Sequence, residues 1–210
     1  MFHFQNIWLF FTVSLIVNFT PGNDVLYVAS RSISQGSSAG IISALGVFCG
    51  CFVHILAAVL GLSLIIAQSA YLFSIIKFAG AAYLVYLGIK ALIAKSDASA
   101  PAQRTIKNNN WKHFKQGFVT DALNPKVAIF FLSFLPQFID PSTHFVKIQL
   151  ATLGLWFAVQ GTLVLILYAL VLGKAKDFFK NSPKAMRIQE KITGVILIGL
   201  GIKLALASKK

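Results

Sequence analysis

Long apolar runs, separated by short basic segments, are the feature of this chain that most restricts its fold. A helix needs roughly 20 apolar residues to cross the hydrocarbon core of a membrane. Only 12% of the 210 residues are charged and 57% are hydrophobic, whereas a soluble domain carries about 25% charged residues. We therefore predict an all-α integral membrane protein, a single transmembrane domain over residues 1–210 with six spans, at approximately 5–29, 40–67, 71–93, 116–138, 146–172 and 188–207.

The distribution of basic residues predicts how the chain lies in the bilayer. The segments around the ends of the first, third and fifth spans carry thirteen Lys and Arg residues, whereas the opposite side carries four. Short basic loops face the cytoplasm, so both termini are expected outside it. This asymmetry accounts for the net charge of +13. The expected partner of the basic loops is the lipid bilayer, and no nucleic acid is expected.

The two halves of the chain share short sequence motifs in the same order. "KFAGAAYLVYLGIKAL" at 77–92 and "KITGVILIGLGIKLAL" at 191–206 both contain Lys-x-x-Gly and Leu-Gly-Ile-Lys. Spans two and five share "ALG" and "TLG", and spans one and four each contain a proline. Three spans per half invert the second copy, as in many secondary transporters. We predict a 3+3 inverted repeat: repeat 1 at about 1–95, a cytoplasmic linker at about 96–114, and repeat 2 at about 115–210.

The two prolines, Pro21 and Pro125, are expected to break helices one and four at the same depth. Each lies ten residues from the nearest expected cytoplasmic cation, Arg31 or Lys115, which is about 15 Å into a core of about 30 Å. Proline removes a backbone donor and frees the carbonyl one turn earlier. Such backbone is tolerated only in protein or against a cavity. Two matched breaks favour a binding site for a polar solute over two structural kinks.

Two of the six acidic residues flank these breaks. Asp24 and Asp121 are expected about 10 Å below the cytoplasmic face, and carboxyl groups within a membrane usually mark ion or substrate paths. We expect them to bind a substrate ammonium group or the coupling proton. The alternative is that they reach the membrane interface, or that they form a structural pair with Lys126 or Arg31. Lys126 is expected near the midplane, to neutralise an acid or hold a substrate carboxylate. His54, in span two, is expected either to relay protons or to pack through a hydrogen bond.

The predicted substrate-binding set gathers around the two breaks, where asparagine side chains can both donate to and accept from a zwitterion. Its members are Asn18, Thr20, Pro21, Gly22, Asn23, Asp24, Asp121, Asn124, Pro125 and Lys126. The predicted proton-coupling residues are Asp24, Asp121 and His54. No catalytic residue, metal ligand or cofactor is expected.

Three other functions are alternatives for a chain of this kind. A transmembrane thiol carrier needs two cysteines that face each other, but Cys49 and Cys51 are two apart on one helix and point away from each other. A membrane enzyme could use Asp24 and Asp121 as a catalytic pair, but no nucleophile and base accompany them. Export of a metal ion or another small metabolite is the remaining alternative.

Several stretches resemble one family, the LysE/RhtB exporters of amino acids from bacteria. They are "FTPGND" followed by "SRS", "KFAGAAYLVYLGIKAL", and "FKQGFVTDALNPKVAIFFLSFLPQFID". The resemblance implies a secondary transporter, not an enzyme, that exports amino acids across the inner membrane by proton-driven antiport and alternating access. It carries the family's functional motifs onto Pro21, Gly22 and Asp24, and onto Asn124, Pro125 and Lys126.

The chain departs from the family pattern at two positions. Asn23 stands where the family usually has a second proline, and Asp121 stands where it commonly has asparagine. Our hypothesis is that the extra acid favours a cationic substrate or an additional proton.

Overall fold

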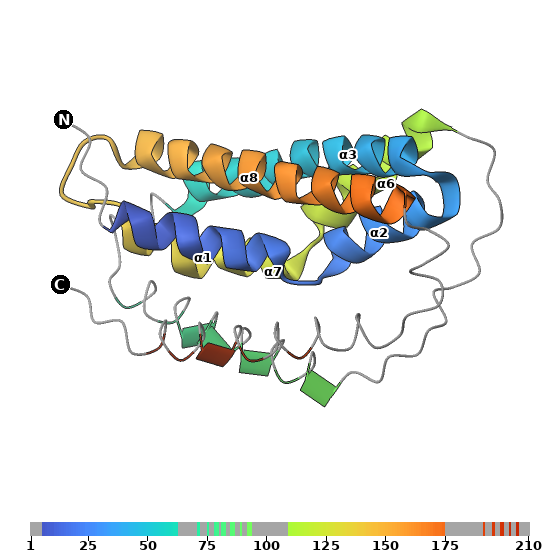
Figure 1. Cartoon of the computed structure of the whole chain (residues 1–210). Helices are drawn as coiled ribbons and strands as arrows, with labels where there is room; N and C mark the ends of the chain where they lie inside the picture. The colour runs from blue at the N-terminus through green and yellow to red at the C-terminus, as the bar shows by residue number, and fades with distance from the viewer. Residues whose placement is uncertain are drawn as a thin grey trace.

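The computed structural model describes residues 6–62 and 109–174, together with single helical positions between 71 and 93 and between 191 and 205. This described part contains helices and no strand. The α-helices are α1 (Ile7–Phe19), α2 (Asn23–Gln35), α3 (Ser37–Ala57), α6 (Asn110–Ala122), α7 (Pro125–Ile129) and α8 (Val146–Lys174). Two π-helical turns, η1 (Ala58–Leu62) and η2 (Phe130–Phe134), and a 3-10 turn, η3 (Leu135–Phe138), complete the elements (Figure 1).

In the described part of the chain, two helices are long and apolar enough to cross a membrane alone. They are Ser37–Gly61, with 25 residues, and Val146–Lys174, with 29. Two bent pairs, α1 with α2 and α6 with Pro125–Phe138, each pass the same test as one broken span. These four segments correspond to predicted spans one, two, four and five. Predicted spans three and six lie mostly outside the described residues, so the 3+3 repeat stays a prediction.

Both predicted breaks are present. The axis bends by 50° between α1 and α2, and by 43° between α6 and Pro125–Phe138. The residue before each proline is extended, Thr20 at ψ 121° and Asn124 at ψ 108°, because the proline ring disfavours a helical residue ahead of it. Helix α7 then begins at Pro125 itself, where the missing N–H costs no helical hydrogen bond. The side chain of Asn124 caps α7 by accepting from the Lys126 amide at 3.0 Å.

The first span continues further than predicted and turns directly into the second. Helix α2 runs to Gln35 and α3 starts at Ser37, so Gly36 alone makes the turn between them. Gly36 has φ 91°, a backbone conformation that glycine adopts without a Cβ clash. The segment between the predicted spans, residues 30–39, is therefore helical except at Gly36.

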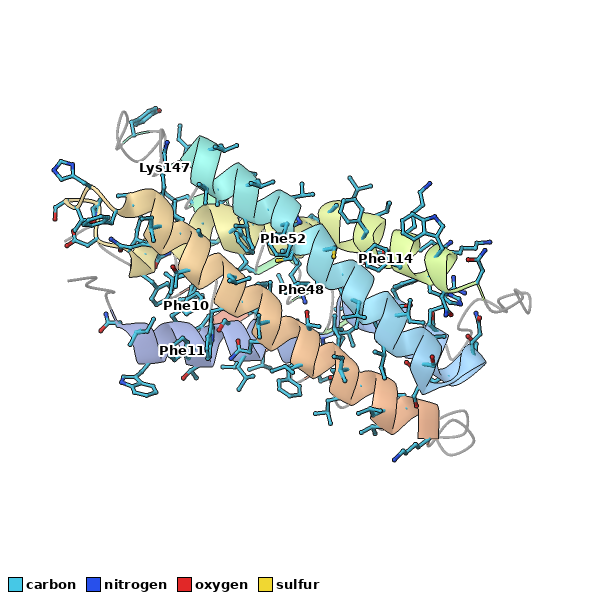
Figure 2. All side chains as sticks on the ribbon, turned by 90° about the horizontal axis from the view of Figure 1, so that it is seen from above. Phe10, Phe11, Phe48, Phe52, Phe114 and Lys147 are labelled. Atoms are coloured by element: carbon cyan, nitrogen blue, oxygen red, sulfur yellow. The ribbon has the colours of Figure 1, made fainter. Side chains whose placement is uncertain are left out.

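The described basic residues are unevenly placed along the bundle. The Gly36 turn, the start of α6 and the end of α8 lie at one end of the molecule, and the starts of α1 and α8 lie at the other (Figure 1). Lys112 and Lys115 belong to the first two turns of α6, and Lys174 ends α8. Lys147 lies at the opposite end (Figure 2). This arrangement matches the charge asymmetry read from the sequence; the sidedness of the termini remains a prediction.

Two apolar clusters lie on either side of the breaks. Toward the α1 end, aromatic rings of α1, η2, η3 and α8 pack together, with the rings of Phe130 and Phe157 stacked at 4.3 Å and those of Phe10 and Phe138 at 5.3 Å. Toward the Gly36 end, smaller side chains of α2, α3 and α8 form a second cluster, which includes Val28, Ala44 and Ala169. The level between the clusters is where the polar residues gather.

Glycines allow α3 and α6 to pack with their backbones in contact. A Cβ on Gly46 would collide with the Phe114 carbonyl, and one on Gly117 would collide with the Ser43 carbonyl. The contact lies within the bundle, as the small-residue spacing Gly46–Gly50 predicts. It fixes the position of Asp121 at the end of α6.

Replacing Gly46 by alanine should lower the free energy of unfolding by about 1–3 kcal/mol, the usual range for overpacking, because a backbone carbonyl cannot rotate out of the way. The measurement is thermal unfolding of purified protein in detergent. Gly61→Ala is the matched control, since a Cβ there meets no described atom within 4 Å. Equal melting temperatures for the two variants would contradict the close packing of α3 on α6.

Candidate functional site

The two breaks meet near the middle of the bundle and bring polar residues from both halves of the chain together (Figure 1). Asp24 lies in the first turn of α2, and Asn124 caps α7. The Asn124 amide nitrogen donates to Asp24 Oδ2 at 2.6 Å. Asp24 is only 6% exposed, and its Oδ1 has no hydrogen-bond partner among the described residues. One carboxylate oxygen is thus held by the opposite half and the other is free for a ligand or a proton.

Lys126 joins the two broken helices. Its ammonium group donates to the carbonyl oxygens of Val17 at 3.2 Å and Thr20 at 3.1 Å, at the end of α1. Pro21 has no N–H to offer Val17, which is four residues earlier, and a cation is stabilised at the negative end of a helix. Gly22 makes room for this contact, because a Cβ there would lie 3.1 Å from Lys126 Nζ. Lys126 therefore gives the Thr20 carbonyl a donor and adds a second donor to the Val17 carbonyl, which also accepts from the Thr20 N–H at 3.2 Å.

Asp121 is the second buried acid, and His54 lies against it. His54 Nε2 is 2.8 Å from the Asp121 carbonyl oxygen and 4.0 Å from its Oδ2. Among the described residues, this is the one contact within 4.0 Å between a carboxylate and a basic side chain, and it is an ion pair only if His54 is protonated. Asp121 is 2% exposed and its Oδ2 has no hydrogen-bond partner there. His54 thus contacts Asp121 on the side away from the central cavity that Asp121 lines.

A small cavity lies between these groups, with a volume of about 30 Å³. Its polar lining comes from Asn18, Asp24, Asp121, Lys126 and Thr162. Its apolar lining includes Val25, Val47, Phe48, Val127, Phe157 and Leu165, and Phe48 lies near the middle of the molecule in Figure 2. A volume of this size holds about two water molecules and falls well below the roughly 300 Å³ of ordinary ligand sites. The structure is therefore closed around its central polar groups.

The predicted site residues are not all brought to this cavity. Asn23 and Pro125 are exposed, and Pro21 lies at the bend without lining the cavity. The Thr20 hydroxyl bonds to the Ile16 carbonyl at 2.8 Å, so Thr20 contributes its own carbonyl, to Lys126. His54 is buried but does not line the cavity.

Helix α8 supplies cavity residues that sequence reasoning did not include. Gly161 and Thr162 line the cavity, and nearby Gln160 accepts from Ser14 Oγ at 2.7 Å. Asn18 donates to the Phe157 carbonyl at 3.3 Å. Gln160, a glutamine inside an apolar span, was the one sequence feature that could have indicated that α8 contributes to the site. Glycine and threonine are too common in membrane helices to indicate a binding site.

The structure also describes both cysteines and other side chains that could bind a metal ion. Cys49 and Cys51 are free thiols on α3, and Cys51 is buried at the cavity wall. Within the residues that the structure describes, no three His, Cys, Asp or Glu side chains converge as metal ligands would.

Comparison with known proteins gives a consistent result. A family model described as LysE type translocator matches residues 15–208. A membrane protein of Bacillus subtilis, YrhP, is 34% identical over 195 residues, which are 89% of this chain and 92% of that protein. The leucine efflux proteins of Salmonella typhimurium and Salmonella typhi are 26% identical over 200 residues, which are 95% of this chain and 94% of theirs. No solved structure matches the chain.

Proposed function

The chain belongs to the LysE type translocator family, and from that premise we propose that it exports amino acids, or close derivatives, by proton-coupled alternating access. The observation that carries the proposal is the contact between the two halves at their breaks. Asp24, Asn18 and Lys126 place a carboxylate, an amide and an ammonium group around one cavity, and Asn124 holds the Asp24 carboxylate from the opposite half. These groups have the charges and hydrogen-bonding capacity that a zwitterion needs.

The chemistry of the cavity supports an aliphatic amino acid as substrate. The free Oδ1 of Asp24 suits an ammonium group, and Lys126 suits a carboxylate. The valine, leucine and phenylalanine side chains of the wall suit an apolar side chain. Relatives named as leucine efflux proteins support the same class. We propose leucine or a similar amino acid, with the bacterial inner membrane as the location and the termini outside.

The mechanism we propose uses the two breaks as hinges. The cavity of about 30 Å³ must widen before an amino acid can enter, and the extended residues Thr20, Gly22 and Asn124 can take up a change of backbone angle. One half of the predicted repeat, residues 1–95, would rock against the other, 115–210, around this site. Asp24 and Asp121 would exchange the proton for the substrate ammonium, with His54 as a relay behind Asp121.

The test is transport by the purified full chain in proteoliposomes. With the interior more acidic than the medium, protons leaving the vesicle should drive the uptake of labelled leucine in exchange, above the level reached without a gradient. Threonine, homoserine, lysine and arginine are assayed beside it, and empty liposomes are the control. If a pH gradient drives none of them, the proposal of proton-coupled amino-acid transport is wrong. Preference for lysine or arginine would instead favour the cationic-substrate hypothesis for Asp121.

A further inference from the structure

A second cavity, larger than the central one, opens between α2 and α6 toward the Gly36 end. Its volume is about 410 Å³, and it is lined by Tyr27, Arg31, Lys115, Gln116, Val119 and Thr120. None of these residues lines the central cavity. Its volume falls within the roughly 300–1,000 Å³ of small-molecule sites, so it has room for a small amino acid while the central cavity is closed.

Arg31 lies buried in the wall of this cavity, without a counter-charge among the described residues. It is 4% exposed; its Nη2 donates to Gln116 Oε1 at 2.9 Å, and its guanidinium carbon is 5.3 Å from the Tyr27 ring centre. Nε and Nη1 have no hydrogen-bond partner among the described residues. A buried guanidinium without an acid is costly, and in the described part of the chain no carboxylate lies within 4.0 Å of it.

One other group that lines the cavity adds positive charge. Lys115 lines the same cavity. His113 is fully buried one turn before Gln116, and neither of its ring nitrogens has a partner among the described residues. A cavity with two cations and unpaired N–H donors, and with no acid among the described residues of its lining, is complementary to an anion. Guanidinium groups form strong charge-assisted hydrogen bonds with carboxylates and phosphates.

The position of Arg31 connects this cavity to the central site. Arg31 follows Asp24 by seven residues on α2, two helical turns, so the two side chains lie on the same face about 10 Å apart along the axis. We infer that Arg31 is the centre of an entry site, which holds the carboxylate of the amino acid before the substrate moves to Asp24. This inference rests on the proposed export of amino acids and adds a binding residue at the Gly36 end.

The first measurement is binding, which does not depend on transport. Thermal unfolding of the purified full chain is followed with 4-methylpentanoate, which has a carboxylate and no ammonium, and with 3-methylbutylamine, which has the reverse. The carboxylate should raise the melting temperature of the wild type, and this shift should vanish in Arg31→Gln. Stabilisation by an anionic phospholipid alone, with none by the carboxylate, would assign the cavity to a lipid headgroup and overturn the inference.

The second measurement is the concentration dependence of leucine transport with the Gly36 end facing the substrate. Arg31→Gln should raise KM by about tenfold or more, as expected for the loss of a charge-assisted hydrogen bond, with kcat little changed. Lys115→Gln should raise KM by a smaller factor, because Lys115 is exposed. Lys112→Gln is the matched control: it removes an exposed cation from the same helix but outside the cavity, and KM should not change.

The outcomes separate the inference from the proposed function. Transport that proceeds with unchanged KM in both Arg31→Gln and Lys115→Gln overturns the entry site and leaves amino-acid export standing. Carboxylate binding that depends on Arg31, in a protein that transports none of the amino acids, supports the anion site and overturns the export proposal. A large loss of melting temperature in Arg31→Gln, with KM unchanged in Lys115→Gln, would make Arg31 a structural partner of an acid elsewhere in the chain and overturn the inference.

Discussion

Replacing Asp24 by asparagine should abolish uptake driven by a pH gradient and leave the fold intact. Asparagine has nearly the same shape, and its carbonyl oxygen can still accept the hydrogen bond that Asn124 donates to Asp24 Oδ2 at 2.6 Å. What it loses is the negative charge and the ability to exchange a proton. A hydrogen bond to a charged group is worth about 1.5–3 kcal/mol, and each 1.4 kcal/mol is a factor of about ten. We therefore expect kcat/KM for leucine to fall by about 100-fold.

The measurement compares gradient-driven uptake with exchange at equal pH on both sides. Asp24→Glu keeps the charge and should retain part of the driven uptake. Asp140→Asn is the matched control, because this carboxylate lies outside the cavity in the segment before α8, where it accepts from Ser142. Unaltered dependence on the pH gradient in Asp24→Asn would remove Asp24 from the coupling step, and Asp121→Asn would then be the variant to test.

The breaks were predictable because the effect of proline is local. A proline inside an apolar run removes one donor and constrains the residue before it, whatever the rest of the fold does. Both breaks are found where Pro21 and Pro125 indicated. Their meeting at one level followed from equal distances to the expected cytoplasmic cations. Asp24 and Lys126, one near each break, line one cavity, which is consistent with this shared depth.

The partners of the charged residues were not predictable in the same way. Lys126 was expected to neutralise an acid or hold a carboxylate, which stays a prediction; the hydrogen bonds of its ammonium group to the carbonyls of Val17 and Thr20 were not foreseen. The direction of a lysine side chain depends on how two helices rotate against each other, and no periodicity in either helix records that rotation. Arg31 served as a marker of the cytoplasmic surface, but it is buried, because α2 continues past it and α6 packs beside it.

Lys126→Met should reduce transport below detection and also destabilise the protein. Methionine keeps much of the apolar stem but leaves the Thr20 carbonyl without the Lys126 donor, whereas the Val17 carbonyl still accepts from the Thr20 N–H at 3.2 Å. An unsatisfied buried polar group costs about 1–3 kcal/mol, and we expect a loss of unfolding free energy of this size, measured by thermal or denaturant unfolding in detergent. Lys126→Arg would not restore the wild type, because the bulkier guanidinium must fit against Gly22.

Combining Lys126→Met with Asp24→Asn tests what the ammonium group does for the site. No ion pair within 4.0 Å joins these two side chains, yet both line one buried cavity, where charges interact more strongly than in water. If Lys126 balances the charge of Asp24, the double variant will be more stable than the sum of the single losses by at least about 0.5 kcal/mol, the lower limit for coupled neighbours. Additive losses would mean that Lys126 stabilises only the carbonyl groups at the end of α1 and does not balance the charge of Asp24. The central site would then carry two uncompensated acids, which is the charge that a cationic substrate or a second proton requires.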